Sequence, residues 1–408
     1  MRLLLMGAVF ILLHATEIIA QDTLKKNEVL NTPVRGEKKK WYENFSIRGY
    51  MQVRYNRLLE TNENLRCEQC DKSIGKGGGV ILRRGRIIFS GYVHKRVFFY
   101  IQPDFGSSTG TTQNILQLRD AYIDLSLDRK NEYRIRIGQS KIPFGFENLQ
   151  SSQNRLPLDR NDGLNSALSN ERDLGAIFYW APEKTRNLFS SFVRDNFKGS
   201  GDYGVFALGV YNGQTANRPE LNNSLHIVSR FSYPIAIGNQ YIEPGIQAYS
   251  GKYVLPTELR SSTVKAANDF EFRDERVAAS FILYPKPFGI QAEYNWGRGP
   301  EYNPVTDSIE VRSLNGGYIT ASMRISAMKD WVFFPFTRVQ QYHGGKKHEL
   351  DARRYIVKEM ESGLEWQMNS NFELTVSYVI SKRRFEDSKL RNNLQKGNFL
   401  RLQAQLNF

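Results

Sequence analysis

Cysteine, histidine and long apolar runs are all scarce in this sequence of 408 residues. Beyond residue 15, no stretch approaches the roughly 18 consecutive apolar residues that predict a membrane-spanning helix. Mean hydropathy is negative, which also excludes a protein built from such helices. The two cysteines lack the two further ligands nearby that a structural zinc site would need.

No arrangement of residues predicts catalysis. The histidines that follow residue 20 are His94, His226, His343 and His348, and none lies in a recognisable Ser–His signature. The segment GKGGG, residues 75–79, has the glycines of a phosphate-binding loop but lacks the Gly-Lys-Ser/Thr ending. We therefore expect neither an enzyme nor a cofactor nor a bound metal.

Cys67 and Cys70 form a C-x-x-C pair in the polar stretch LRCEQCDKSIGKGGG. In an exported protein such a pair most simply forms a local disulfide within a surface loop. A free redox pair and a metal site are the alternatives. We predict the disulfide.

The N-terminus predicts export. The apolar run LLLMGAVFILLHA, residues 3–15, follows Arg2 and is too short to cross a bilayer. We interpret residues 1–20 as a secretory signal peptide, with a short membrane anchor as the alternative. Residues 21–40 are polar and aperiodic, which predicts a flexible basic leader.

The charge balance points to anionic partners. Lys and Arg number 56 against 42 Asp and Glu, a formal net charge of +14. Such a charge would fit a nucleic-acid-binding protein, but an exported protein seldom meets that partner. We expect no nucleic acid and predict instead small anions, outer-membrane lipid and the phosphates of lipopolysaccharide.

The chain ends in FLRLQAQLNF, where apolar and polar residues alternate without a break. A period of two predicts a strand with one apolar and one polar face. The same alternation recurs along most of the chain, for example in FSIRGYMQVRY and NFELTVSYVI. In a soluble sandwich the apolar face would form the core, whereas in a membrane barrel it would face lipid.

The connections between strands favour the barrel. Short turns such as residues 127–132, 284–289 and 368–371 alternate with longer polar loops. We expect those loops at residues 59–79, 146–172, 212–223, 253–269, 298–314, 341–354 and 382–396. Short turns at one rim and long loops at the other are typical of outer-membrane barrels. We predict that residues 41–408 form an all-β, antiparallel transmembrane barrel of roughly 16 strands, with short periplasmic turns and long extracellular loops. A soluble or surface-layer β-protein is the alternative.

Several segments resemble one known family. The runs ILRRGRIIFSGYVHKRVFFYIQPDF, LQLRDAYIDL, RIRIGQSKIPFGFENLQSS and NERDLGAIFYW are similar, in order and spacing, to the phosphate-selective porin O/P family. The terminal Phe408 resembles the aromatic assembly signal of Gram-negative outer-membrane proteins. The resemblance implies a 16-stranded barrel in the outer membrane of a Gram-negative bacterium. It also implies a homotrimer and a phosphate path of inward-facing arginines and lysines.

The alternation selects candidates for the pore wall. Fixed cations in a narrow, low-dielectric pore raise the local concentration of anions. Arginine suits phosphate because its planar guanidinium donates two parallel hydrogen bonds. The candidates are Arg48, Arg54, Arg84, Arg86, Arg134 and Arg136, with Lys141 at the approach to the next loop. These charges could instead serve only hydration and rim packing.

The segment of residues 146–172 is longer than a simple connection between two neighbouring strands of a compact barrel needs to be. We expect this loop to fold into the lumen as a constriction, bringing Arg155, Arg160 and Arg172 toward the pore. An exposed extracellular loop is the alternative. The neighbouring acidic residues could hold the loop's shape or weaken anion selectivity.

Together these features predict a passive outer-membrane channel for small anions, with phosphate or polyphosphate as candidate solutes. One alternative is a general diffusion porin whose basic lumen is incidental. Another is a surface adhesion or structural barrel with a closed pore.

Overall fold

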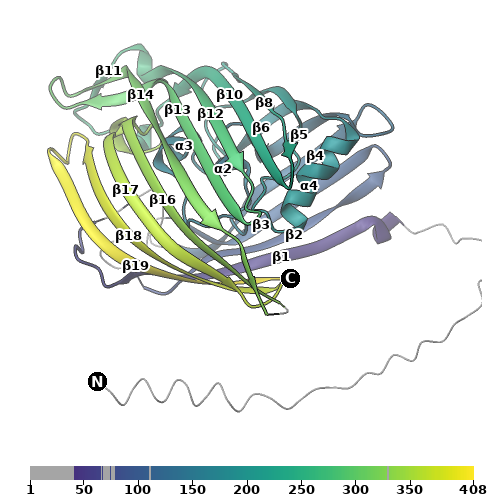
Figure 1. The fold of residues 1–408 in the computed structure, drawn as a ribbon. Helices are drawn as coiled ribbons and strands as arrows, with labels where there is room; N and C mark the ends of the chain where they lie inside the picture. Colours follow the sequence, from purple (N-terminus) through teal and green to yellow (C-terminus); the bar gives the residue numbers. More distant parts are fainter. Residues whose placement is uncertain (1–40, 66, 68–73, 75–78, 110–111, 329) are drawn as a thin grey trace, which may run out of the picture. The chain divides into compact units, whose positions relative to one another are not determined.

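The computed structural model describes residues 41–408, except residues 66, 68–73, 75–78, 110–111 and 329. The predicted signal peptide and basic leader lie outside these described residues. Within them the chain forms a closed antiparallel barrel of sixteen long strands (Figure 1). Because β1 pairs with both β2 and β19, the first and last strands close the wall. The predicted fold class is confirmed.

The long strands run up and down around the barrel in sequence order. They are β1 (Phe45–Leu58), β2 (Ile81–His94), β3 (Val97–Thr109), β4 (Thr112–Ser126), β5 (Tyr133–Lys141), β6 (Arg172–Trp180), β7 (Phe206–Tyr211), β8 (His226–Ser232), β10 (Gln240–Val254), β12 (Glu271–Leu283), β13 (Phe288–Asn303), β14 (Ser308–Met323), β16 (Trp331–Gly345), β17 (Arg354–Gln367), β18 (Phe372–Glu386) and β19 (Asn393–Asn407).

Three short strands complete the sheet. They are β9 (Ile235–Ile237), β11 (Lys265–Ala266) and β15 (Ile325–Ala327). β9 continues β8 along the same partner, β10, and β15 continues β14 along β16. β11 lies in the connection between β10 and β12 and pairs parallel with β14. The barrel wall therefore consists of sixteen strands.

The last strand shows which face looks outward. Leu402 and Leu406 are each 40% exposed, whereas Gln403 and Gln405 are buried toward the lumen. The apolar face of the alternation is therefore the outer wall. This is the arrangement of a membrane barrel, in which polar side chains line the inside.

Several connections differ from the expected loops. Residues 298–314 and 382–396 are mostly strand, because β13 and β14, and β18 and β19, extend into tall hairpins, whereas residues 341–354 are strand only at 341–345 and 354. Residues 188–195, where the alternation is weak, lie largely in helix α4 (Glu183–Arg194), which buries Phe189 and Phe192. A helix buries side chains three or four positions apart, so its period differs from that of a strand.

The remaining helices are short. They are α2 (Phe146–Leu149), α3 (Asp162–Ala167), η1 (Trp41–Asn44), η2 (Thr257–Leu259), η3 (Asn268–Phe270) and η4 (Leu350–Ala352). None of the described helices combines the length and apolar character needed to cross a membrane. Helices α2 and α3 lie between β5 and β6 in the sequence and inside the barrel wall in space (Figure 1).

Candidate functional site

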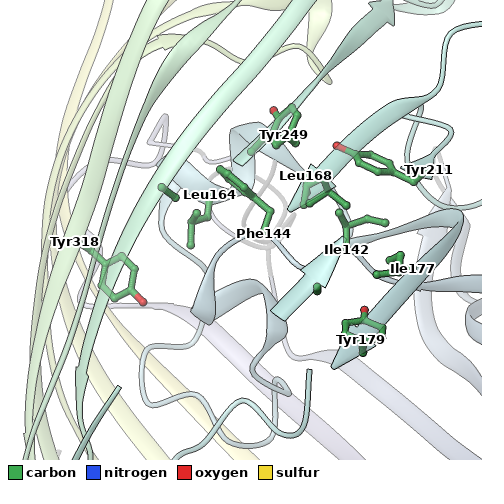
Figure 2. Close-up of a cluster of buried hydrophobic side chains, with 13 residues drawn as sticks. Ile142, Phe144, Leu164, Leu168, Ile177, Tyr179, Tyr211, Tyr249 and Tyr318 are labelled. Atoms are coloured by element: carbon green, nitrogen blue, oxygen red, sulfur yellow. The ribbon is translucent and has the colours of Figure 1, made fainter. Parts of the chain in front are cut away.

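The connection between β5 and β6, residues 142–171, lies inside the barrel; we call it the inserted loop. Its apolar residues Ile142, Phe144, Leu164 and Leu168 are buried against inward-facing side chains of β6, β7, β8, β10, β12 and β14. The Phe144 ring meets the ring of Tyr249 edge-on, with 4.9 Å between centroids. Figure 2 shows this cluster between loop and wall. The packing fixes one side of the loop to the wall.

Local sequence features direct the inserted loop toward the lumen. Gly145 has φ +84°, and a Cβ there would lie 2.8 Å from Leu164 Cδ2, so the position favours glycine. The Glu293 carboxylate on β13 accepts hydrogen bonds from the backbone N–H groups of Phe146 and Glu147, at 2.5 and 2.8 Å. Asn161 caps α3 by accepting from the Leu164 N–H. Both short helices are thus held at their N-termini.

Ion pairs anchor the acidic side of the inserted loop. Asp162 pairs with Lys346 and with Arg383, and Asp159 pairs with Arg54 and Arg401. Burial alone would raise the pKa values of both aspartates, but these cations lower them below their usual range. Both carboxylates therefore stay ionised at neutral pH and bind the loop to the wall.

Glu147 extends this anchorage. Its carboxylate lies 3.2 Å from the guanidinium of Arg338, whose other terminal nitrogen lies 3.0 Å from Glu361. Arg338 also donates to the backbone oxygen of Asp159. The cations on β16, β18 and β19 thus hold the loop.

Cations gather on a second part of the lumen wall, where the inserted loop meets β2, β4, β5 and β6. This basic cluster consists of Arg84 and Arg86 of β2, Arg119 of β4, Lys141 of β5, Arg155 and Arg160 of the loop, and Arg172 of β6. Three carboxylates lie among these seven cations: Asp104, Asp120 and Glu171. Among the described residues, the basic cluster therefore contains four more cations than anions.

Glu171 is the shared counterion of the basic cluster. Its carboxylate lies 2.7 Å from Arg172, 3.0 Å from Arg160 and 3.4 Å from Arg155, with the Lys141 ammonium at 3.8 Å. Burial would raise the pKa of Glu171, but the four cations lower it well below its usual value. The same burial lowers the pKa of Arg160 to about 10, which still leaves it protonated at neutral pH. One carboxylate thus neutralises only a fraction of the positive charge around it.

Two β-bulges turn additional arginines to the lumen. The β1–β2 register passes from Gln52↔Arg84 to Val53↔Leu82, so Arg83 is the extra residue. Its guanidinium reaches Asp159 of the inserted loop at 3.5 Å. The β3–β4 register skips Arg119 in the same way, and Arg119 lies 3.9 Å from Asp104. A bulge places two consecutive residues opposite one residue of the neighbouring strand and changes the direction in which their side chains point.

Arg84 and Arg119 are the least neutralised members of the basic cluster. Arg84 donates one hydrogen bond, to the side-chain oxygen of Gln52, and among the described residues no carboxylate lies within ion-pair distance of it. Its neighbours are the like-charged Arg83, Arg86 and Arg155. Within the described chain, the Nε–H groups of Arg84 and Arg119 have no acceptor. A buried donor without an acceptor is costly, so these groups favour an anion or water beside them.

Three of the other four predicted wall arginines are more completely neutralised. Arg136 donates two hydrogen bonds to Asp124, at 2.7 and 2.8 Å, and Arg134 lies 2.8 Å from Asp202. Arg54 pairs with Asp159 at 3.2 Å. Arg48 is exposed near the turn end of β1, 5.9 Å from the ring of Tyr100. The structure thus brings Arg84, Arg86 and Lys141 together with Arg155, Arg160 and Arg172, and leaves the other four predicted arginines outside the basic cluster.

Half-buried lumen residues mark where solvent enters. Tyr100 and Tyr122 stack with their centroids 5.1 Å apart, and Tyr203 is likewise half-buried. Near the end of the barrel that carries the short turns, a cavity of about 350 Å³ is lined by Arg48, Lys198 and other polar residues. Half-buried aromatic rings of β3 and β4 therefore line the side of the lumen that carries the basic cluster, whereas Lys198 beside the cavity is paired with Glu365 at 2.5 Å.

The predicted disulfide extends beyond the described residues. Cys67 is buried and accepts a 3.3 Å hydrogen bond from Arg383, whereas Cys70 lies outside the described residues. The cysteine pair therefore stays a prediction.

Strict alternation missed Arg83 and Arg119, since it assigns both to the outer face. It also gave no reason to select the anchoring cations Arg338, Arg383 and Lys346. A signal for Arg83 was present: of two arginines in succession within a regular strand, one would face lipid, which is costly.

Comparison with known proteins agrees with this architecture. Residues 65–408 match the family model described as phosphate-selective porin O and P. No curated protein matches the chain. The outer-membrane channel DcaP of Acinetobacter baumannii has a similar structure, with a TM-score of 0.55 at 14% identity, covering 89% of this chain and 97% of that chain.

Two further solved structures share the fold. The anion-selective porin from Comamonas acidovorans gives a TM-score of 0.54 at 7% identity, covering 89% of this chain and 99% of that chain. Salmonella typhi OmpF in complex with daunomycin gives a TM-score of 0.53 at 13% identity, covering 89% of this chain and 97% of that chain. At these identities the likeness shows the barrel alone. Together with the family match, it identifies the chain as a member of the phosphate-selective porin O and P family and an outer-membrane channel.

Proposed function

We propose that this channel conducts small anions in preference to cations, with phosphate and polyphosphate as the candidate solutes. The basic cluster is the observation that carries the proposal, because four of its cationic charges are not balanced by its carboxylates. In a low-dielectric lumen, an uncompensated charge acts over a longer distance than in water. Guanidinium groups with free N–H donors also match the oxygens of phosphate.

The division of cations within the lumen supports this proposal. Arginines and lysines on the β16–β19 side pair with Glu147, Asp159 and Asp162 and hold the loop. Those of the basic cluster outnumber their carboxylates. A passing anion would meet several weak sites in series, and weak sites allow release as well as entry. A homotrimer, which the family resemblance implies, is the assembly we expect.

The proposal is tested by recording single channels of the purified protein in a planar bilayer under a KCl gradient. We expect a reversal potential on the anion side and a chloride current that added phosphate blocks. Replacing Arg84 and Arg119 together by Gln should lower the anion-to-cation permeability ratio several-fold.

The matched control removes the lumen pair Arg230 and Glu243 as R230Q/E243Q. This pair, 3.0 Å apart, carries no net charge, so selectivity should be unchanged. Conductance without anion preference in the wild type would make the protein a general diffusion porin. A folded barrel without conductance would favour adhesion or a closed structural role.

A further inference from the structure

Lysines form a row on the outer wall near the long-loop end of the barrel. Lys358 of β17 pairs in register with Lys382 of β18, which pairs with Lys396 of β19. All three side chains are exposed and alternate with buried lumen residues, so they face outward. Arg384, two positions beyond Lys382, faces the same way. Like charges directly opposite one another across strands are destabilising unless an anion lies between them.

The lysine row lacks protein counterions. Among the described residues, no ion pair or hydrogen bond involves the side-chain ammonium groups of Lys358, Lys382 and Lys396. Outward cations elsewhere on this rim do face carboxylates. Examples are Arg57 with Glu60 at 2.9 Å, Lys252 with Glu271 at 3.1 Å, and Arg273 with Glu275 at 2.8 Å.

The lysine row lies at the edge of the apolar band. Toward the turn end, the outward residues of β18 are Ile380, Tyr378, Val376, Leu374 and Phe372. These eight steps cover roughly 26 Å along the strand, or roughly 20 Å across the membrane at a tilt of about 40°. That distance approaches the apolar band of about 25 Å typical of such barrels. Because long loops are extracellular in these barrels, the lysine row lies at the level of the outer-leaflet head groups.

An apolar groove adjoins the row. It holds a volume of about 750 Å³ along the outer wall from β12 to β18, and Lys358 lies on its border. Its outward side chains include Phe281, Ile319, Val339, Met360 and Ile380, all between 42% and 58% exposed. Met360 and Ile380 lie one outward position from Lys358 and Lys382 toward the membrane centre. The surface therefore combines a cationic edge with an apolar groove below it.

We propose that the lysine row and this groove bind one phosphorylated glycolipid of the outer leaflet, the phosphates on the lysines and an acyl chain in the groove. Clustered basic side chains at a membrane interface attract anionic head groups. This site lies on the outer wall, so it does not depend on what the lumen conducts.

The test uses the purified full-length barrel in detergent, with diphosphorylated lipid A and its dephosphorylated form as probes. Native mass spectrometry measures the binding of each lipid. The variant K358Q/K382Q/K396Q removes the row. The control K95Q/K130Q/K184Q removes three exposed lysines near the short-turn end. A heat-dependent shift in electrophoretic mobility reports folding for every variant.

We expect the wild type and the control to bind the diphosphorylated lipid at least tenfold more tightly than the dephosphorylated form. K358Q/K382Q/K396Q should lose that preference. Preference retained in the folded triple variant would overturn the proposal, as would equal binding of both lipids by the wild type. A triple variant that changes oligomeric state while binding lipid normally would assign the row to a second copy of the chain and overturn it too.

Discussion

Arg134 and Arg136 show how ion pairing changes the expected effect of a substitution on ion selectivity. From the sequence, replacing both by Gln is expected to lower anion preference without preventing assembly. In the structure they face Asp202 and Asp124. The double variant would therefore also leave Asp124 without its arginine partners, and Asp202 with Arg186 alone, so that uncompensated carboxylate charge beside the lumen would attract cations.

A variant with four substitutions separates the loss of the two arginines from the effect of the carboxylates that they leave uncompensated. R134Q/R136Q should lower the anion-to-cation permeability ratio, and adding D124N and D202N should return it close to the wild-type value, because the net charge is then restored. The measurement is the reversal potential under a KCl gradient. A quadruple variant whose preference stays low would instead show that these arginines contact the passing anion.

At the scale of elements, the alternation of residue types predicted each strand face where the strand is regular. It assigned the polar side of the last strand to the lumen, as Arg401, Gln403 and Gln405 are buried there. It failed for Arg83 and Arg119, because a bulge depends on the register with a neighbouring strand. It also failed at α4, where apolar residues at helical spacing do not give a strand pattern.

The inserted loop was predicted from length alone, and length cannot say what holds it. Its position depends on contacts with distant residues, such as Asp162 with Arg383 and Phe144 with Tyr249. These partners lie on other strands far along the sequence. Neither charge pattern nor periodicity identifies them, so the loop's burial needed the structure.

Leu164 tests the apolar attachment of this loop. L164A removes a side chain that is 1% exposed, and we expect a loss of about 2–5 kcal/mol of stability. The loosened loop should also produce larger fluctuations of single-channel current. Urea midpoints of the electrophoretic mobility shift and bilayer recordings measure the two effects.

The matched control is L174A, since Leu174 is 47% exposed on the outer face of β6. It should leave the current unchanged. If L164A lost stability but its current stayed as steady as that of L174A, the inserted loop would not shape the conduction path.

At the scale of the whole molecule, the net charge of +14 predicted anionic partners but not their location. The structure divides the cations into groups with different surroundings. Those on the β16–β19 side pair with the loop's carboxylates, those of the basic cluster outnumber their counterions, and the lysine row faces the membrane. Composition counts these groups together, because only the fold determines which carboxylate each cation meets.

This division predicts how selectivity depends on pH. Asp159, Asp162 and Glu171 have pKa values below their usual range because neighbouring cations outweigh the effect of burial. Arg160 keeps its charge, with a pKa of about 10, and burial lowers the pKa of His348 well below its usual value, so that it stays neutral. The charges of these residues, and with them their contribution to the anion-to-cation permeability ratio, should therefore be constant between pH 8 and pH 5.

Stability should follow the sign of these shifts. A carboxylate whose pKa is lower in the folded state stabilises the fold above its unfolded-state pKa of about 4, and this contribution is lost as pH falls through the folded-state value. The barrel should therefore lose its inserted-loop contacts only in strong acid. Reversal potentials at pH 8, 6.5 and 5, together with urea midpoints from pH 7 to 3, measure both effects. A selectivity midpoint between pH 5 and 8 would mean that an ionisable group other than these residues sets the charge seen by a passing ion.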